Sequence, residues 1–305
     1  MSFRSRVVPA IIAAIALGTA VPASDAAEAQ PSMVRVSYGP PAESKERGVA
    51  NALRATPDVI TLSAPPRDSE EEGRRRFEPV AQYLSKALGK KVVYRHPGTW
   101  GVYQGEMQKG AYDIVFDGPH FNGWRMERLQ HSILVKVPGD FTQVIFVPKD
   151  STITAVKELA GRTICAHAPP NLGTLVVQRA FDNPARQPSI IVVEGYKNIY
   201  QAMVDGKCKA AVLPRNHLHK FDAAGAMRVV YQSGAMPNQA FSAGPRLSDE
   251  ERSRLSAALL APEAEAPTAK IREVYTGGKA FVAATNAEYA GLGEYLRDEW
   301  GYYER

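Results

Sequence analysis

The fold is decided by two similar stretches, MQKGAYDIVFDGPH at residues 107–120 and MVDGKCKAAVLPRN at residues 203–216. Each pattern predicts the end of an amphipathic helix, a glycine that tolerates the left-handed cap conformation, a short apolar strand and a polar loop. Such apolar runs are typical of strands buried on both faces of a parallel sheet. Ligands of open α/β sheets bind outside the carboxyl ends of these strands. The pair therefore predicts two α/β lobes with polar loops at a shared cleft, although any two βαβ units are alike at this level.

The N-terminus has the pattern of a secretory signal peptide. Arg4 and Arg6 precede a charge-free apolar run over 7–21, and small residues follow it. The run is shorter than the roughly 20 residues that a transmembrane span needs. We expect cleavage between positions 23 and 29, so that 1–29 is the signal peptide and 30–57 is a lead-in of unassigned role. The signal predicts a location in the periplasm.

Length and charge indicate a globular exported protein. Cleavage would leave about 275 of the 305 residues, enough for two domains of roughly 100–200 residues each. The net charge of +5 is modest and the Lys and Arg residues are spread out, so we expect no nucleic-acid partner. The charged run over 70–76 pairs opposite signs near i, i+4 spacing, which favours the start of a solvated helix over a binding patch.

Cys165 and Cys208 are the two cysteines of the chain. No cysteine precedes them, so lipid attachment through an N-terminal cysteine is excluded and we expect a soluble protein. In an oxidising compartment the pair can form a disulfide if neighbouring strands bring the two residues within reach. Two small buried thiols are the alternative.

Helices and strands alternate from residue 58 to 213, after which helices dominate. This alternation predicts parallel sheets covered by helices. Ser248 followed by Glu251 is a capping-box pattern that opens one of the late helices. The expected strands are 34–38, 59–63, 91–95, 114–116, 144–148, 163–167, 190–193 and 210–213, and the expected helices are 77–88, 100–109, 154–161, 173–181, 199–204, 247–260, 267–275 and 287–296.

Two extended stretches, 141–148 and 232–241, flank the middle block and are candidates for crossings between lobes. The predicted architecture is α/β, with two Rossmann-like lobes joined by two crossing strands and a ligand cleft between them. Lobe I would comprise 58–141 and 238–305, and lobe II would comprise 142–237.

The order of these pieces resembles the type II periplasmic solute-binding proteins, in particular the phosphate, phosphite and phosphonate branch of ABC importers. The segments that carry the resemblance are FEPVAQYL at 77–84, LGKKV at 88–92, GAYDIVFDGP at 110–119, VIFVPKDS at 144–151 and VKELAGR at 156–162. The resemblance implies a monomeric protein that closes two lobes on a small anionic ligand and delivers it to a membrane permease.

The resemblance also shows where this chain departs from the family pattern. The family's lobe II places a Ser-Thr-Ser type run at a helix N-terminus to hold a phosphoryl group, whereas this chain has Asn171 and Thr174 there. After Gly-Pro the family often has Ser and Tyr, and here His120 and Phe121 follow. A helix N-terminus still favours anions. These departures disfavour a phosphonate with an amino group. A different small anion and a ligand that prefers histidine and aromatic faces are equally open alternatives.

Candidate ligand contacts follow the predicted strands. Asp117 and His120 come after 114–116, and replacing His120 or Thr174 by Ala is expected to weaken binding. Ordinary caps, core packing or surface exposure are the structural alternatives for several of these residues. The full candidate set is Ser63, Trp100, Tyr103, Asp117, His120, Asn171, Thr174, Tyr196 and Arg215.

Three functions other than import are alternatives. His120 and His167 follow strands of different lobes and would suit a metal or metal chelate if a third ligand lay near them. A periplasmic sensor that docks on a membrane kinase would need the same closure. A hydrolase or transferase lacks support, because the sequence has no Gly-x-Ser-x-Gly, His-Glu-x-x-His or phosphate-binding lysine motif. We expect neither catalysis nor a cofactor.

Overall fold

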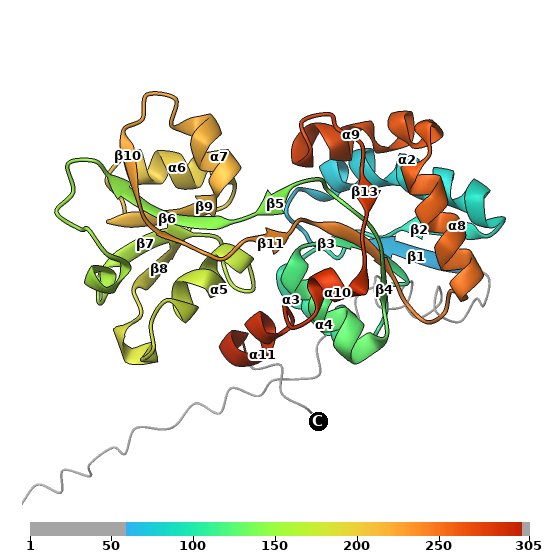
Figure 1. Ribbon diagram of the computed structural model, residues 1–305, viewed down its shortest axis with the longest axis horizontal. Helices are drawn as coiled ribbons and strands as arrows, with labels where there is room; N and C mark the ends of the chain where they lie inside the picture. The colour runs from blue at the N-terminus through green and yellow to red at the C-terminus, as the bar shows by residue number, and fades with distance from the viewer. Residues whose placement is uncertain (1–58, 301–305) are drawn as a thin grey trace, which may run out of the picture. The chain divides into compact units, whose positions relative to one another are not determined.

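The computed structural model describes residues 59–300, with side chains described through Arg297. The signal peptide, the lead-in and the strand expected at 34–38 lie outside the described residues. Within these bounds the chain forms two α/β lobes, each with its own sheet (Figure 1). We propose the boundaries 58–141 with 238–305 and 142–237 as the division between them.

Lobe I is built on a six-stranded sheet in the order β13-β4-β12-β3-β1-β2. Its first part contains β1 (Val59–Ser63), α2 (Glu70–Leu88), β2 (Lys91–Tyr94), α3 (Trp100–Gln108), β3 (Ile114–Asp117), α4 (Pro119–Leu129) and β4 (Ser132–Lys136). The part that returns from lobe II contains β12 (Ala240–Ala243), α8 (Asp249–Leu260), a 3-10 turn (Pro262–Ala264), α9 (Glu265–Tyr275), β13 (Val282–Ala283), α10 (Asn286–Tyr289) and α11 (Glu294–Trp300).

Lobe II is built on a five-stranded sheet in the order β10-β6-β9-β7-β8. Its elements are β6 (Gln143–Pro148), a 3-10 turn (Val156–Leu159), β7 (Thr163–Ala166), α5 (Leu172–Arg179), a second 3-10 turn (Pro184–Arg186), β8 (Ser189–Val192), α6 (Tyr196–Val204), β9 (Ala210–Pro214), α7 (Arg215–Phe221) and β10 (Met227–Gln232).

Two crossings join the lobes, as the sequence predicted. The strands β5 (Asp140–Phe141) and β11 (Met236–Pro237) pair with each other as a short antiparallel ribbon between the two sheets (Figure 1). Helix α11 also contacts both lobes, because it packs against α4 and against α5.

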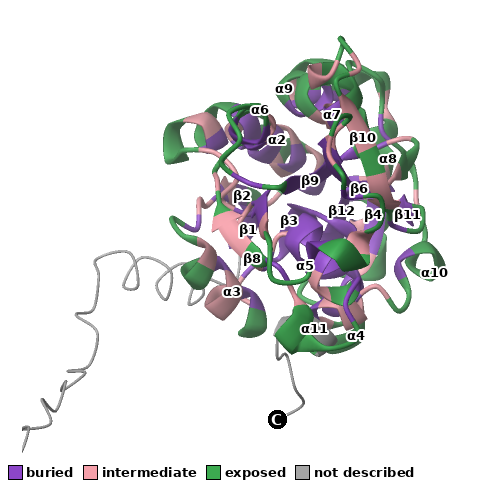
Figure 2. Ribbon diagram, turned by 90° about the vertical axis from the view of Figure 1, so that its left-hand side faces the viewer, coloured by how far each residue is buried: buried purple, intermediate pink, exposed green. Residues whose placement is uncertain are grey.

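Local signals explain why most elements begin and end where they do. Helix α2 starts at the Ser69 cap with three glutamates in its first turn, and it ends at Gly89 in the left-handed conformation, φ 67°. Helix α8 has the predicted reciprocal capping box between Ser248 and Glu251. In each lobe buried apolar side chains form a core between sheet and helices. Figure 2 shows the buried residues concentrated on the central strands and on the inner parts of the helices.

The two similar stretches at 107–120 and 203–216 occupy equivalent places in the two sheets. Strand β3 pairs in parallel with β1, and β9 pairs in parallel with β7. On its other side β3 pairs antiparallel with β12, and β9 pairs antiparallel with β6. The expectation of parallel sheets was therefore wrong in part: both sheets are mixed, because the strands that follow the crossings enter them in the opposite direction.

Several elements differ from the expectations. The strands β4 and β10 and the helix α4 were not predicted, and the expected helix at 154–161 is a single 3-10 turn over Val156–Leu159. The stretch after Asp117 is not a polar loop, because Pro119 occupies the first turn of α4 and its fixed φ favours a helix start. The stretch after Leu213 is not a polar loop either, because α7 starts at Arg215. The helix expected at 287–296 is divided between α10 and α11.

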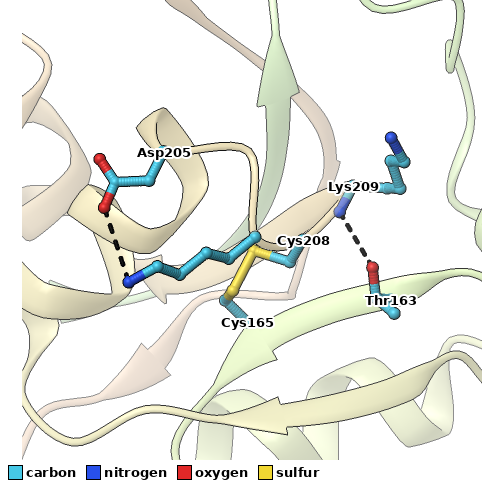
Figure 3. Close-up of a disulfide and its surroundings, with 6 residues drawn as sticks. Thr163, Cys165, Asp205, Cys208 and Lys209 are labelled. Carbon is cyan, nitrogen blue, oxygen red and sulfur yellow. Dashed lines mark hydrogen bonds and ion pairs between the residues drawn. A yellow bond between two sulfur atoms is a disulfide. The ribbon is translucent and has the colours of Figure 1, made fainter.

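Cys165 and Cys208 form a disulfide, which is one of the two alternatives that the sequence left open (Figure 3). Cys165 lies in β7, and Cys208 lies just before β9, the neighbouring strand. Their Cα atoms are 5.7 Å apart across 43 residues of sequence. Disulfides persist in oxidising compartments, so the bond agrees with export from the cytoplasm.

We expect the disulfide to stabilise lobe II measurably. Replacing both cysteines by Ala, or reducing the wild-type protein, should lower the free energy of unfolding by about 2–4 kcal/mol, because the unfolded chain regains the freedom that the cross-link removes. Denaturant unfolding with and without dithiothreitol measures the loss. The double variant serves as the control, since dithiothreitol should not affect it. Equal stability of the oxidised and reduced wild-type proteins would contradict this prediction.

Candidate functional site

The candidate site lies where the two sheets direct their carboxyl-terminal loops toward each other. In lobe I, β1 lies between β2 and β3. The chain therefore continues from β1 to β2 on one side of β1 and then crosses to β3 on the other side. Lobe II repeats this arrangement with β8-β7-β9. The loops at such switch points leave a crevice in which ligands of open α/β sheets bind.

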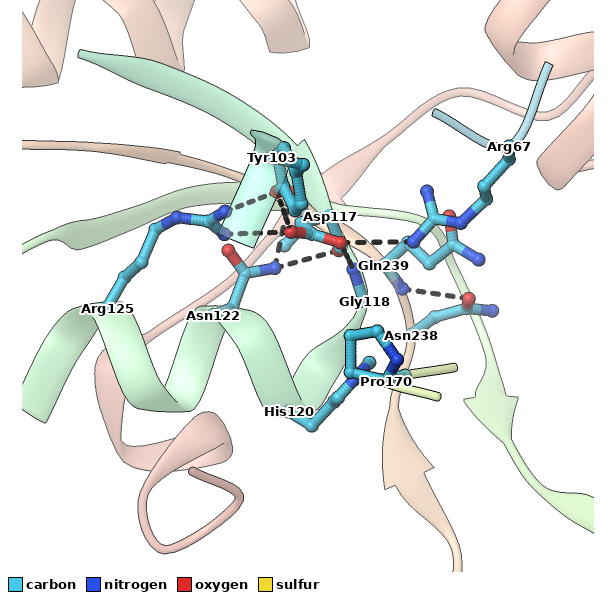
Figure 4. A network of polar contacts seen from close by, with 11 residues as sticks. Arg67, Tyr103, Asp117, Gly118, His120, Asn122, Arg125, Pro170, Asn238 and Gln239 are labelled. Carbon is cyan, nitrogen blue, oxygen red and sulfur yellow. Dashed lines mark hydrogen bonds and ion pairs between the residues drawn. The ribbon is translucent and has the colours of Figure 1, made fainter. Parts of the chain in front are cut away.

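Asp117 is the centre of a buried polar network in lobe I (Figure 4). Its side chain is fully buried and accepts hydrogen bonds from the Tyr103 hydroxyl, the Gly118 N–H at 2.7 Å and Arg125 Nη1 at 2.9 Å. Arg67 Nη2 forms an ion pair with the other carboxylate oxygen at 3.0 Å. Each oxygen of the carboxylate is therefore paired with a guanidinium, which is what a buried charge requires.

The network carries a positive charge in excess. Burial raises the pKa of Tyr103 well above its ordinary value, so this phenol is neutral. Two guanidiniums, those of Arg67 and Arg125, then face one carboxylate. Burial disfavours the charge on Arg67, but Tyr275 and Asp117 outweigh this effect and its pKa is raised. Among the described residues, the cluster therefore keeps about one unbalanced positive charge at neutral pH.

His120 connects the lobes from the first turn of α4. Its Nε2 lies 3.0 Å from the carbonyl oxygen of Pro170, which belongs to lobe II. Since a carbonyl can only accept, Nε2 carries the proton and Nδ1 has a free lone pair. Burial lowers the pKa of His120 to about 4, so the ring is neutral at pH 7. Its Nδ1 is buried and has no hydrogen-bond partner among the described residues.

A small cavity of about 20 Å³, room for about one water molecule, lies between the lobes. Arg67 is the charged side chain that lines it. Besides His120, Gln143 and Gln239 bring a buried polar atom without a partner in the described part of the chain, Oε1 in each case. The lining residues are Arg67, Trp100, Gly118, Pro119, His120, Phe121, Phe141, Gln143, Asn171, Leu172, Tyr196 and Gln239.

Lobe II adds aromatic rings to this region. The ring centroid of Tyr196 lies 5.0 Å from that of His167 and 4.6 Å from that of His217. Burial lowers the pKa values of both histidines to about 4, so this surface of lobe II is uncharged. A groove of about 1110 Å³ lined by His217, Tyr275 and other residues lies on the α7 and α9 side, and Phe141 lines both the groove and the cavity.

The structure brings four of the predicted contacts to the cavity: Trp100, His120, Asn171 and Tyr196. Two others, Ser63 and Thr174, use their hydroxyl groups in hydrogen bonds within the protein. The Ser63 hydroxyl donates to the Arg95 carbonyl at 2.8 Å, and the Thr174 hydroxyl donates to the His167 carbonyl.

The Tyr103 hydroxyl donates a hydrogen bond to the Asp117 carboxylate, and neither residue lines the cavity. Arg215 is exposed, contacts Gln232 and lines the groove instead of the cavity.

Sequence reasoning missed Arg67, Gln143 and Gln239. Arg67 follows β1 in the loop that starts at Ala64, so its position beyond a strand end was a usable signal. The two glutamines lie on the crossing segments, where no helical or strand periodicity distinguishes a cavity residue from a core residue. Their roles depend on which lobe surfaces meet.

The metal alternative lacks its third ligand. No group of three or more His, Cys, Asp or Glu residues within 59–297 is arranged to hold a metal ion. His120 faces the cavity, whereas His167 does not line it.

Comparison with known proteins identifies the family. The sequence profile described as "ABC transporter, phosphonate, periplasmic substrate-binding protein" matches residues 62–289. The chain belongs to this family. It is therefore a periplasmic substrate-binding protein of an ABC importer, a class that takes a small-molecule ligand and docks on a membrane permease. Within the described residues no helix is long and apolar enough to cross a membrane.

Individual relatives are distant. The phosphate-import protein PhnD of Mycolicibacterium smegmatis is 24% identical over 221 residues, which is 64% of this chain and 68% of that protein. PhnD1 from Prochlorococcus marinus, solved in complex with methylphosphonate, superposes with a TM-score of 0.62 at 15% identity, over 80% of this chain and 98% of that one. XAC2383 from Xanthomonas citri, solved with bound ATP, superposes with a TM-score of 0.63 at 14% sequence identity, over 80% of this chain and 99% of that one. These likenesses show the bilobal fold.

The buried neutral histidines predict a loss of stability in mild acid. His120 has a folded-state pKa of about 4, below its ordinary value of 6.5, so between these values the unfolded chain binds more protons. The free energy of unfolding should therefore fall as the pH drops from about 6.5 to 4, by up to about 3 kcal/mol from His120 alone. Denaturant unfolding at pH 7, 5.5 and 4.5 measures this.

His120→Gln should reduce the pH dependence, and His219→Gln, at an exposed position, is the matched control. A free energy of unfolding that is constant from pH 7 to 4.5 would contradict the prediction.

Proposed function

We propose that this protein captures a small phosphorus oxyanion between its lobes and that Arg67 is the charged group that binds it. The observation that carries the proposal is the unbalanced positive charge of the Asp117 network, which reaches the cavity through Arg67. An anion there restores neutrality in a buried site, where an unpaired charge is costly. A guanidinium also presents a planar set of donors that matches phosphoryl oxygens.

Three further groups are placed to orient the ligand. His120 and Gln239 reach the cavity from lobe I, and Asn171 reaches it from lobe II, where its side chain also caps α5. The N-terminus of this eight-residue helix adds a partial positive charge. The hydroxyl-rich run of the family is absent here. Recognition of the ligand therefore depends more on Arg67 and on the side-chain amides of Asn171 and Gln239.

Entry of the ligand requires the lobes to separate. The cavity holds about one water molecule, which is less than a phosphorus oxyanion occupies. The paired crossing strands β5 and β11 are the segments about which the lobes can open, and the contact between His120 and the Pro170 carbonyl is broken and remade as they do. The ligand then favours the closed form by bonding to both lobes.

We also propose the remaining features of an importer component for this chain. It is exported through a cleaved signal peptide, acts as a monomer and releases its ligand unchanged to the permease. The disulfide in lobe II supports the export step, because such bonds persist in oxidising compartments.

Arg67→Ala should weaken binding of methylphosphonate, phosphite or phosphate by roughly 10- to 100-fold, because hydrogen bonds to a charged group contribute about 1.5–3 kcal/mol. Arg67→Lys keeps the charge but loses the planar set of donors, so its affinity should lie between those of the wild type and Arg67→Ala. Isothermal titration calorimetry of the mature protein measures these affinities.

Arg215→Ala is the matched control, because Arg215 is exposed and does not line the cavity. Thermal unfolding without ligand checks that each variant folds, since Asp117 keeps Arg125 and Tyr103 as partners. If Arg215→Ala were the more damaging change, the anion would bind in the groove and the assignment of Arg67 would be wrong.

A further inference from the structure

The strongest unexplained feature of the site is the edge of the His120 ring that carries Nδ1. His120 is 3% exposed, and Nδ1 has no partner among the described residues, although its other nitrogen is fixed by Pro170. A buried polar atom without a partner costs free energy. The bond to Pro170 also decides the tautomer, so the atom that faces the site is an acceptor and not a donor.

The space in front of this nitrogen exists because residue 118 is a glycine. A Cβ at position 118 would lie 3.2 Å from His120 Nδ1 and 3.7 Å from Arg67 Nη2. The backbone there is extended, φ −70° and ψ 163°, a conformation that any residue can adopt. The local backbone conformation therefore does not require glycine, and its absent side chain leaves room between an acceptor and a guanidinium.

An acceptor next to a cation imposes two different chemical requirements on one ligand. The guanidinium of Arg67 favours a negatively charged oxygen, and the Nδ1 lone pair favours a hydroxyl hydrogen. The network behind them supplies one net positive charge, because two guanidiniums face one carboxylate. A ligand with one negative charge and at least one O–H group satisfies all three conditions.

We propose that His120 Nδ1 accepts a hydrogen bond from a hydroxyl of the bound oxyanion, so that the site selects singly charged, protonated oxyanions over fully deprotonated ones. This inference rests on the proposed function and adds to it the protonation state of the ligand. A hydrogen phosphonate or dihydrogen phosphate ion meets the requirement, whereas sulfate has a second charge and no proton. Repulsion between two lone pairs excludes sulfate.

In this geometry, closure of the lobes is coupled to selection of the protonated ligand. The bond from His120 Nε2 to the Pro170 carbonyl forms when lobe II meets lobe I, and that bond holds the tautomer with a free Nδ1. The groups that act electrostatically on the ring are Asp117, Arg67 and Arg125. On the lobe II side, Arg67 acts electrostatically on His167 and Tyr196. Burial keeps His120 neutral above about pH 4.

The test is calorimetric titration of the mature protein with methylphosphonate at pH 5.5, 6.5, 7.5 and 8.5, in two buffers of different ionisation enthalpy. Wild-type affinity should be constant below the second pKa of methylphosphonate and should fall about tenfold per pH unit above it, with uptake of about one proton on binding. Sulfate at the same concentrations should give no binding. A flat pH profile, or sulfate binding as tightly as methylphosphonate, would overturn the inference.

Variants at two positions separate His120 from the net charge of the site. His120→Gln keeps a donor within reach of Pro170 but removes the Nδ1 lone pair, so it should bind more weakly and with a smaller pH slope. Gly118→Ala fills the space with one methyl group and should reduce affinity at least tenfold. Gly105→Ala, where an added Cβ meets nothing within 4 Å, is the matched control and should bind as the wild type does.

The outcomes distinguish this inference from the proposed function. If the wild-type protein binds none of methylphosphonate, phosphite and phosphate at any pH, the proposed function fails and the inference fails with it. If binding is retained but His120→Gln keeps the full pH slope, or Gly118→Ala binds like the wild type, the proposed function stands and His120 is not the acceptor. Thermal unfolding of each variant without ligand confirms that it is folded.

Discussion

Most of the candidate site depends on one buried carboxylate. Asp117 has no exposed surface, and it is held by donors from three directions: Tyr103 of α3, Arg125 of α4 and Arg67 of the loop after β1. Each donor comes from a different element, so the ion pairs also fix how these elements meet at the end of β3. Because one carboxylate serves two guanidiniums, the same network that orders lobe I also leaves it short of one negative charge.

The features that the sequence predicted are those with local causes. The cap at Gly89, the capping box at Ser248 and the apolar runs of β3 and β9 each follow from a few neighbouring residues. The antiparallel direction of β6 and β12 was not predicted, because it is set by the crossings between lobes. Arg67 was missed for a related reason: its partner Asp117 is 50 residues away, and nothing near Arg67 in the sequence indicates that pairing.

The side chains that were predicted to contact the ligand because they follow a strand fall into two groups, and the reason is physical. His120 and Asn171 lie in the first turn or at the cap of a helix, so they reach the space beyond the sheet edge. Asp117 is the last residue of β3, and its carboxylate is surrounded by the donors of its own lobe. Position at a strand end thus locates the site, while the contacts within each lobe decide which of its residues remain free to bind a ligand.

The two lobes contribute unequal chemistry at equivalent positions. The end of β3 leads to the charged network and to His120, whereas the end of β9 leads to Pro214 and the exposed Arg215. Lobe II instead supplies uncharged rings and the N-terminus of α5. An anion bound to lobe I alone would satisfy Arg67 but would leave these groups without contact. Since a ligand shifts a conformational equilibrium only by its preference for one state, this division of charge and contact surface would allow the proposed oxyanion to favour closure.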